Sequence, residues 1–144
     1  MTTVTEAVSV DEELLEGLAR LIPQLSSSAT AVGRAELAEM VEESGTHLLV
    51  ARDQDAVIIG VLTLVVFRIP TGIRAWIEDV VVDQTARGRG VGEALARDAL
   101  RIAVGSGAKT VDLTSRPIRR SANRLYERLG FEVRDTNVYR LELE

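Results

Sequence analysis

The stretch that decides the fold reads Trp76-Ile77-Glu78-Asp79-Val80-Val81-Val82, followed shortly by the glycine-rich turn Arg87-Gly88-Arg89-Gly90-Val91-Gly92. The first run is rich in β-branched and apolar residues, which indicates a strand. Residues 93–100, which follow the turn, have the composition of a helix. A glycine-rich turn from a strand into a helix leaves several backbone N–H groups without acceptors and pointing the same way. Such a turn binds an anion, most often a phosphate or a pyrophosphate.

Two familiar phosphate motifs are absent from this turn. A Walker A loop requires a second glycine five residues after the first, and from Gly88 that place is taken by Glu93. The dinucleotide fingerprint Gly-x-Gly-x-x-Gly fits Gly88 and Gly90, but its third glycine again falls at Glu93. What remains is Arg-x-x-Gly-x-Gly, from Arg87 to Gly92, and this short pattern needs support from the rest of the chain.

Length and composition predict one soluble globular domain over residues 1–144, with 46% hydrophobic and 27% charged residues. The net charge of −5 argues against a nucleic-acid partner. The chain has no cysteine and a single histidine, His47, so we expect no disulfide, thiol nucleophile or metal site. Residues 1–10 lack the features of a signal peptide, and the longest apolar stretch, 56–67, is too short to span a bilayer. We therefore expect no membrane partner and a cytoplasmic location.

Hydrophobic periodicity and turn residues predict the order β-α-α-β-β-β-α-β-α-β-β. Pro23 and the serines after it are expected to end the first helix. This order predicts an α+β fold in which helices flank a central mixed, mostly antiparallel sheet, with a crossover near the glycine loop. The expected strands are 3–8, 47–51, 57–67, 74–83, 110–114, 131–134 and 138–143, and the later helices are 34–44, 90–105 and 121–129.

A second cluster reads Ser121-Ala122-Asn123-Arg124-Leu125-Tyr126, and it ends at Gly130-Phe131. Asn123 and Tyr126 are three residues apart and share one helix face, although an isolated tyrosine is also typical of the edge of a core. Together with Val82 and Arg87-x-x-Gly90-x-Gly92, the pattern Asn123-x-x-Tyr126-x-x-x-Gly130-Phe131 resembles the GCN5-related N-acetyltransferase (GNAT) family. The resemblance runs over residues 57–143. One departure affects only a turn, because Gln84 stands where many members have proline.

The resemblance implies acetyl-coenzyme A as the donor substrate, and it assigns roles to the two motifs. The backbone of Val80, Val81 and Val82 would pair with the pantetheine arm, and the N–H near Val80 would bind the oxyanion. Arg87, Gly88, Arg89, Gly90, Val91 and Gly92 would bind the pyrophosphate, and Asn123 and Tyr126 would contact the coenzyme. The physical chemistry agrees, because a helix N-terminus attracts negative charge by about 0.3–1 kcal/mol and arginines add charge-assisted donors. Arg89 is equally well explained as a solvated surface residue.

The implied reaction is direct attack of a primary amine on the thioester through a tetrahedral intermediate. It requires that the amine lose a proton and that the departing thiolate gain one. We expect Tyr126 to be the general acid and Glu78 to be the base, acting through a water, with Asp79 as its rival. Strand geometry places Glu78 and Asp79 on opposite faces unless a bulge intervenes. The alternative is that one or both carboxylates have a structural role.

Other polar and aromatic residues admit two interpretations. The basic run Arg116, Arg119, Arg120, Arg124 and Arg128 is either a solvated face or an edge that contacts phosphate. Trp76 and Tyr139 either line the acceptor pocket or pack elsewhere, and His47 is expected to be a strand or surface residue rather than a catalytic one. We expect the acceptor to be a small-molecule or peptide amine, in a pocket shaped by the first two helices and residues 68–74 and 135–138. Exposed strand edges near the carboxyl end favour a homodimer.

Two alternative functions remain open at this stage. The same fold could serve as a non-catalytic acyl-coenzyme A sensor or interaction module. A Rossmann-type nucleotide-binding module would use Asp112 as the acid that binds the ribose. The missing third glycine and the hairpins of the first half count against this second alternative.

Overall fold

The computed structural model describes residues 1–143, which form two compact units, Met1–Thr114 and the segment that begins at Ser115. That the two units form one domain stays a prediction. Unit 2 contains the helix α4 (Arg120–Arg128). Unit 1 contains the other elements: β1 (Thr3–Glu6), α1 (Glu12–Leu25), α2 (Arg34–Glu42), β2 (Thr46–Arg52), β3 (Ile58–Ile69), β4 (Gly72–Val82), the 3₁₀ helix η1 (Gln84–Ala86), α3 (Val91–Gly105) and β5 (Thr110–Asp112).

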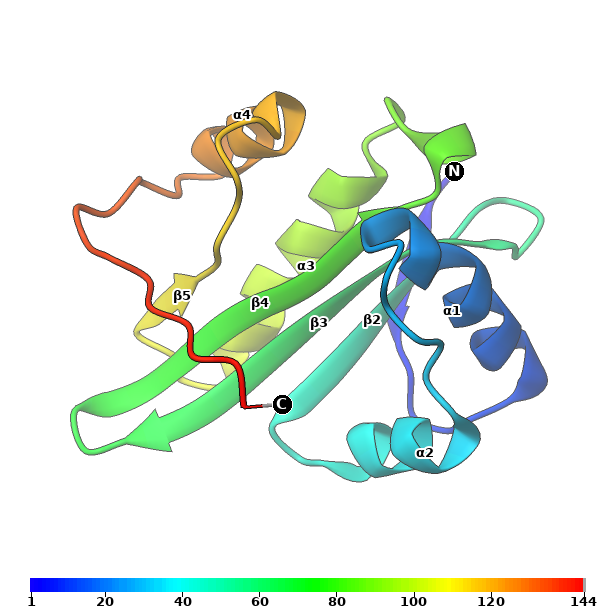
Figure 1. Ribbon diagram of the computed structural model, residues 1–144, viewed down its shortest axis with the longest axis horizontal. Coiled ribbons are helices and arrows are strands. Elements are labelled where there is room, and N and C mark those ends of the chain that lie inside the picture. The colour runs from blue at the N-terminus through cyan, green and yellow to red at the C-terminus, as the bar shows by residue number, and fades with distance from the viewer. Residues whose placement is uncertain (144) are drawn as a thin grey trace. The chain divides into compact units, whose positions relative to one another are not determined.

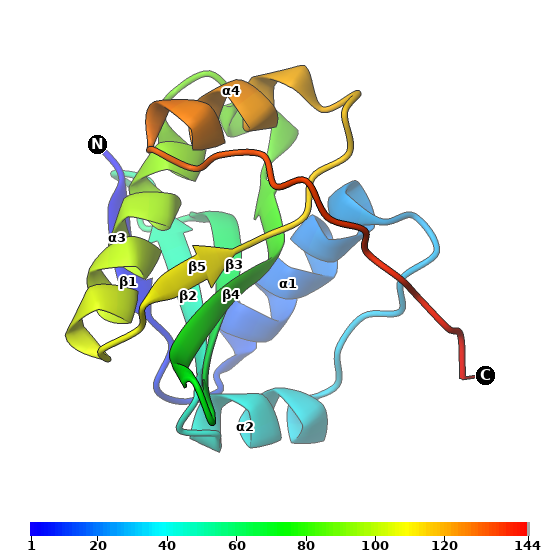
Figure 2. The same cartoon turned by 90° about the vertical axis from the view of Figure 1, so that its left-hand side faces the viewer.

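Unit 1 is built around a five-stranded sheet with the strand order β1-β2-β3-β4-β5 (Figure 1). Neighbouring strands pair antiparallel from β1 to β4, and β5 pairs parallel to β4. Helix α3 covers one face of the sheet, and α1 lies on the opposite face (Figure 2). The expected α+β class and mostly antiparallel sheet are therefore confirmed. The Rossmann alternative is wrong, because that fold requires a parallel sheet.

Helices α1 and α3 each pack on the sheet through buried residues at helical spacing. On α1, Leu14, Leu18 and Leu21 are buried, and the Asp11 carboxylate caps the helix by accepting from the Leu14 N–H at 2.8 Å. On the other face, α3 presents mostly alanines to the sheet, so helix and strands can approach closely. The two elements are in tight contact at Gly60 of β3, where an added Cβ would lie 3.1 Å from a Val91 side-chain carbon. The start of α3 is thereby held against the middle of the sheet.

Two details of the expected order are corrected by the structure. Helix α1 continues through Pro23 to Leu25, because Ala19, whose carbonyl loses its helical donor, is exposed to water, as is Pro23. The two strands expected at 131–134 and 138–143 are absent among residues 131–143, although helix α4 is formed as expected. A strand requires a hydrogen-bonded neighbour, and the alternating apolar pattern of 138–143 finds none: Tyr139 and Leu141 are 87% and 82% exposed.

Helix α2 is anchored by one side chain, which makes a stability prediction possible. Leu37 is its buried residue and packs in the core between α1 and the sheet. We expect Leu37→Ala to lower the free energy of unfolding by about 2–5 kcal/mol, because the cavity adds to the lost transfer energy. Urea denaturation followed by circular dichroism measures the change. The neighbouring exposed Glu36→Ala is the control, and an equal loss in both variants would contradict this account of α2.

Candidate active site

A β-bulge shapes the strand that carries the candidate bases. Along β3 and β4, Val61 lies opposite Val81, whereas Thr63 lies opposite Glu78, so β4 has one more residue than β3 in this interval. Asp79 in the bulge has φ +49°, in the left-handed region that aspartate tolerates better than most residues. The strand therefore contains the bulge, whose presence the sequence alone did not decide.

The bulge changes which side chains share a face. Val61 and Val81 belong to the core cluster under α1 and α2. Thr63 follows Val61 at strand period, and Glu78 is its cross-strand partner, so Glu78 lies on this same face. An unbroken strand would have placed Glu78 and Val81, three residues apart, on opposite faces. The side chain of Glu78 is thus directed to the α1 side of the sheet and remains exposed.

The Glu78 carboxylate has one fixed partner. The indole N–H of Trp76 donates to its Oε2 at 2.7 Å, between side chains two residues apart on the same face of β4. Trp76 is therefore placed beside the candidate base rather than in the core, since Ala75 and Ile77 are the residues of this segment that are buried. One carboxylate oxygen is held in this way, and the orientation of the side chain is defined.

The second half of β4 has an open edge. On the side away from β3, β5 pairs only with Arg74, Ala75 and Trp76. Within the described part of the chain, Glu78–Val82 has no strand partner on that side. An unpaired strand edge presents backbone donors and acceptors to an extended ligand. The expected pantetheine-binding residues Val80, Val81 and Val82 lie on this edge, which runs directly toward the glycine loop.

The glycine loop has the backbone geometry that its sequence predicts. Gly88 and Gly90 have φ +82° and +79°, and a Cβ added at either would meet nothing within 4 Å. Gly90 is the N-cap of α3 without a side-chain cap, and the first helical hydrogen bond runs from the Ala94 N–H to the Gly90 carbonyl. The N–H groups of Val91 and Gly92 therefore precede the first helical bond. The open space lies where an anion can approach them.

The side chains of the two loop arginines contact backbone carbonyls nearby in the chain. Arg89 donates to the Thr85 carbonyl at 2.9 Å, and Arg87 Nε contacts the Val82 carbonyl at 3.4 Å. Both side chains are exposed. A guanidinium carries five N–H donors, so one backbone contact leaves several donors for an anion.

Sequence reasoning missed a buried carboxylate at the start of the loop. Asp83 is 8% exposed, the one charged residue that is buried among residues 1–143. It accepts hydrogen bonds from the Thr85 N–H and Oγ1, each at 3.0 Å, and from Arg20 of α1 at 3.0 Å. The Thr85 backbone bond lowers the pKa of Asp83, with further help from the Thr85 hydroxyl and Arg20 and against the effect of burial. The Asp-x-Thr pattern after a strand was a usable signal for this turn.

Unit 2 holds the candidate acid. Tyr126 is buried, at 9% exposed, and its ring meets Phe131 edge-on at a centroid distance of 5.8 Å. Burial raises the pKa of Tyr126, and the positive charge of Arg119 opposes the shift. The phenol is therefore protonated at neutral pH. A raised pKa also makes the phenol a weaker acid, which works against proton donation to a thiolate.

The other predicted residues of unit 2 order its backbone or remain exposed. Asn123 Nδ2 donates to the Arg116 carbonyl at 3.0 Å, which closes the turn before α4. Of the two aromatic candidates for the acceptor pocket, Tyr139 is exposed. The basic side chains of this unit are all exposed: Arg116, Arg119, Arg120, Arg124 and Arg128.

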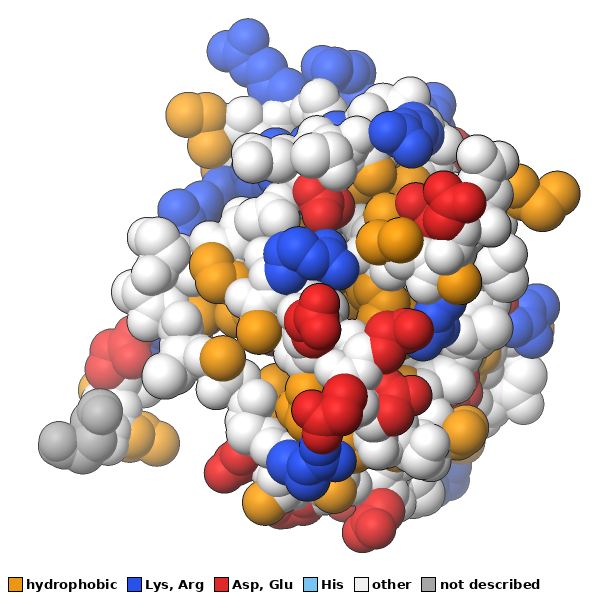
Figure 3. Space-filling model, turned by 90° about the vertical axis from the view of Figure 1, so that its right-hand side faces the viewer, with side chains coloured by type: hydrophobic (Ala, Val, Ile, Leu, Met, Phe, Trp, Pro, Cys, Tyr) orange, Lys and Arg blue, Asp and Glu red, His pale blue; other side chains and the backbone are white. Residues whose placement is uncertain are grey.

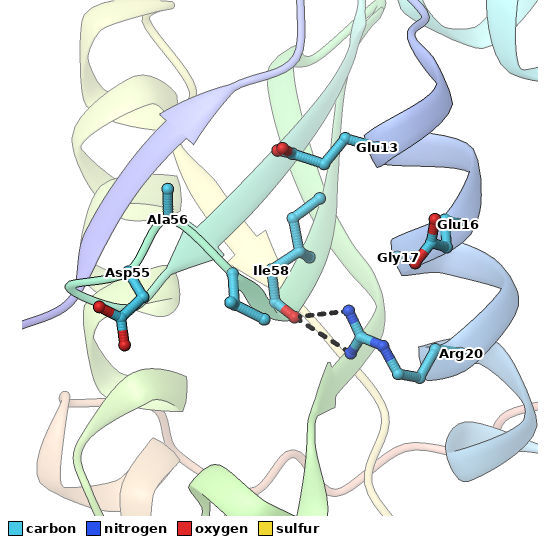
Figure 4. Close-up of a pocket in the computed structure, with 8 residues that line it drawn as sticks. Glu13, Glu16, Gly17, Arg20, Asp55, Ala56 and Ile58 are labelled. Atoms are coloured by element: carbon cyan, nitrogen blue, oxygen red, sulfur yellow. Dashed lines mark hydrogen bonds between the residues drawn. The ribbon is translucent and has the colours of Figure 1, made fainter.

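Unit 1 also has an open pocket of about 460 Å³ between α1 and the turn that joins β2 to β3 (Figure 4). Glu13, Glu16, Arg20 and Asp55 line it, together with apolar residues, and none of the predicted site residues does. Acidic side chains gather on the side of the molecule that carries α1 (Figure 3). Two of them, Glu12 and Glu13, are paired with Arg34 and Arg52.

No cluster of three or more His, Asp or Glu side chains suited to a metal ion occurs within residues 1–143. None of the helices described is long and apolar enough to cross a membrane. His47 has a structural contact, a 2.8 Å pair with Glu6 between β2 and β1.

The model of the acetyltransferase (GNAT) family matches residues 16–131. An acetyltransferase of Trypanosoma brucei is 28% identical with a TM-score of 0.80, covering 99% of this chain and 100% of that chain. An aminoglycoside acetyltransferase from an uncultured soil sample has a TM-score of 0.85 at 17% identity, over 99% and 96% of the two chains.

A third similar structure is AAC(6')-Iy in complex with a bisubstrate analogue that contains coenzyme A. It has a TM-score of 0.79 at 18% identity, over 99% of this chain and 98% of that chain. At this identity and at that of the soil enzyme, the likeness shows the fold alone. No curated protein has a significantly similar sequence.

The family assignment rests on sequence and structure together. The family model covers most of the chain, including β4, the glycine loop, α3 and α4. Acetyl-coenzyme A is the donor substrate that this family uses. The chain belongs to the acetyltransferase (GNAT) family, and the protein is an acyltransferase.

Proposed function

We propose that the protein transfers an acetyl group from acetyl-coenzyme A to a primary amine of a small-molecule or peptide acceptor. The observation that carries the proposal is the continuous path along β4. The open edge of Val80–Val82 leads through η1 into a loop whose helical N–H groups have no acceptor within α3. An extended thioester that ends in a diphosphate fits such a path, with its acyl group beside the bulge.

Each group has a defined task in this proposal. The amine nitrogen attacks the thioester carbonyl carbon, and its proton passes through a water to the Glu78 carboxylate. The Val80 N–H stabilises the oxyanion of the tetrahedral intermediate. The carbon–sulfur bond then breaks, and the thiolate takes the phenolic proton of Tyr126. This last role requires the Tyr126 hydroxyl to reach the sulfur.

The test is a screen for thiol release from acetyl-coenzyme A across amine classes. Aminoglycosides belong in it because a similar structure is named for them, beside polyamines, small metabolite amines and peptides. We expect one class to be acetylated, with mass spectrometry showing one acetyl group per thiol released. Tight binding of acetyl-coenzyme A by calorimetry with no turnover on any amine would instead establish a non-catalytic sensor.

The choice between the two candidate bases has its own test. We expect Glu78→Gln to lower kcat/KM by about 10²-fold or more, because a base is lost. This loss applies at pH values below the one at which the amine deprotonates without help. Asp79→Asn is the matched control, since asparagine also tolerates the left-handed backbone at this place. Kinetics from pH 6 to 10 measure both. A larger loss in Asp79→Asn would assign the base to Asp79.

A further inference from the structure

Helix α1 is tied to the start of the glycine loop at two successive residues. Arg20 Nη1 donates to Asp83 Oδ2 at 3.0 Å, and the backbone N–H of Gln84 donates to Gln24 Oε1 at 2.9 Å. Arg20 and Gln24 are four residues apart and lie on one face of α1. Gln24 Nε2 also contacts the Arg20 carbonyl at 3.3 Å. One turn of α1 therefore holds both residues that lead from β4 into the loop.

The same turn of α1 also holds the start of β3. Both terminal nitrogens of Arg20 donate to the Ile58 carbonyl at 3.1 Å, and Figure 4 shows this guanidinium reaching from α1 to the strand. The helix can come this close because Gly17, one turn earlier, has no Cβ. A Cβ added there would lie 3.0 Å from the Ile58 side chain. The Asp83 N–H in turn donates to the Ile59 carbonyl at 2.8 Å. Arg20 thus joins the end of β4 to a fixed point on the sheet.

The bond at Gln84 exists because this residue is not proline. Proline has no backbone N–H and would leave Gln24 without this donor. Proline would, however, restrict the turn by its ring. In this chain the turn is held instead by two side chains of α1, Arg20 and Gln24.

We propose that Arg20 and Gln24 are positioning residues for the coenzyme, because they hold Asp83 and Gln84 so that Arg87–Gly92 presents its N–H groups to the diphosphate. This inference rests on the proposed function. Contacts to the diphosphate are remote from the reacting atoms and are made equally before and during the chemical step. Their loss therefore raises KM for acetyl-coenzyme A and leaves kcat unchanged.

The experiment compares two donors in two variants. With acetyl-coenzyme A, we expect KM and the calorimetric Kd to rise about 3- to 10-fold in Gln24→Leu and about 10- to 100-fold in Arg20→Met. With acetyl-pantetheine, which has no diphosphate, kcat/KM is expected to match the wild type. A variant that is merely less well folded would lose activity on both donors. Arg52→Met is the matched control, because it removes another arginine pair of α1, to Glu13, away from the loop.

Proline at position 84 supplies a rescue. Asp83 has φ −52° and ψ 132°, a conformation that the residue before a proline adopts, and Gln84 is the first residue of η1. Gln84→Pro therefore fits the backbone while removing the N–H. We expect Gln24→Leu/Gln84→Pro to return the KM for acetyl-coenzyme A to within about 2-fold of the wild type, because the ring restricts the turn.

The outcomes separate this proposal from the proposed function. Wild-type protein that binds no acetyl-coenzyme A would overturn both. Wild-type affinity in Arg20→Met and Gln24→Leu, or equal losses on the two donors, would overturn only the role of α1. Failure of the proline rescue would show that Gln24 acts otherwise than by holding the turn.

Discussion

Replacing Tyr126 by phenylalanine should lower kcat by about 10²- to 10⁴-fold, the range for loss of a positioned proton donor. Among residues 1–143 none is hydrogen-bonded to the Tyr126 hydroxyl, and the edge contact of the ring with Phe131 is kept by phenylalanine. The change in stability should therefore be small. The calorimetric Kd for acetyl-coenzyme A should also stay near the wild-type value, since the ring itself is retained.

The pH profile adds a signature that a packing role would not produce. Burial raises the pKa of Tyr126 above its ordinary value of about 10, so the phenol keeps its proton through the neutral range. The wild type should therefore lose activity by ionisation of the phenol only at higher pH, and this alkaline limb should vanish in Tyr126→Phe. Tyr139→Phe removes the other tyrosine hydroxyl of the chain, from an exposed side chain, and is the control. Equal kcat values in the two variants would remove Tyr126 from the reaction.

The raised pKa of Tyr126 also makes the stability of the fold depend on pH. Because the folded-state pKa of Tyr126 lies above the unfolded value, the unfolded chain releases this proton first as the pH rises. The corresponding contribution to stability is full below the unfolded pKa and is lost between the two values. Asp83 behaves in the opposite way. Its lowered pKa contributes stability above the unfolded value of about 3.8, and this is lost as the pH falls through the folded pKa.

The glycine loop could be predicted from the sequence because its requirements are local. Positive φ at Gly88 and Gly90 and the start of a helix at Val91 follow from residues within the loop itself. The bulge depends on the register between β3 and β4. The sequence shows only that Glu78 and Asp79 lie on opposite faces unless a bulge intervenes, and the pairing of Thr63 with Glu78 is what shows the bulge and the face on which Glu78 lies.

The contacts of α1 with the loop could not be predicted from the local sequence. Arg20 is partly exposed on an amphipathic helix, where a solvated arginine is the ordinary expectation, and Asp83, its partner, is 63 residues away. The expected strands of 131–143 failed for a related reason. Alternation at 138–143 describes one strand, whereas a ladder needs a second chain segment whose position the pattern does not contain.

Replacing Gly90 by alanine should weaken acetyl-coenzyme A binding by about 10- to 100-fold, equivalent to the loss of one charge-assisted hydrogen bond of about 1.5–3 kcal/mol. The added Cβ would stand in space that is open in the structure, with nothing within 4 Å, and in the proposed binding mode the diphosphate approaches the loop there. It would also strain the backbone, because φ at Gly90 is +79°. We expect this strain to lower the free energy of unfolding by about 1–2 kcal/mol.

Gly107 separates the strain from the loss of binding. It has the same φ of +79°, beyond the far end of α3, and its added Cβ would meet only the Ile73 side chain at an ordinary 3.8 Å. Gly107→Ala should therefore lose as much stability as Gly90→Ala in urea denaturation and yet bind acetyl-coenzyme A with wild-type affinity by calorimetry. Acetyl-pantetheine should be used equally well by both variants, because it lacks the diphosphate. Equal affinities for acetyl-coenzyme A in the two variants would mean that the loop does not bind the diphosphate, since only Gly90 belongs to the loop.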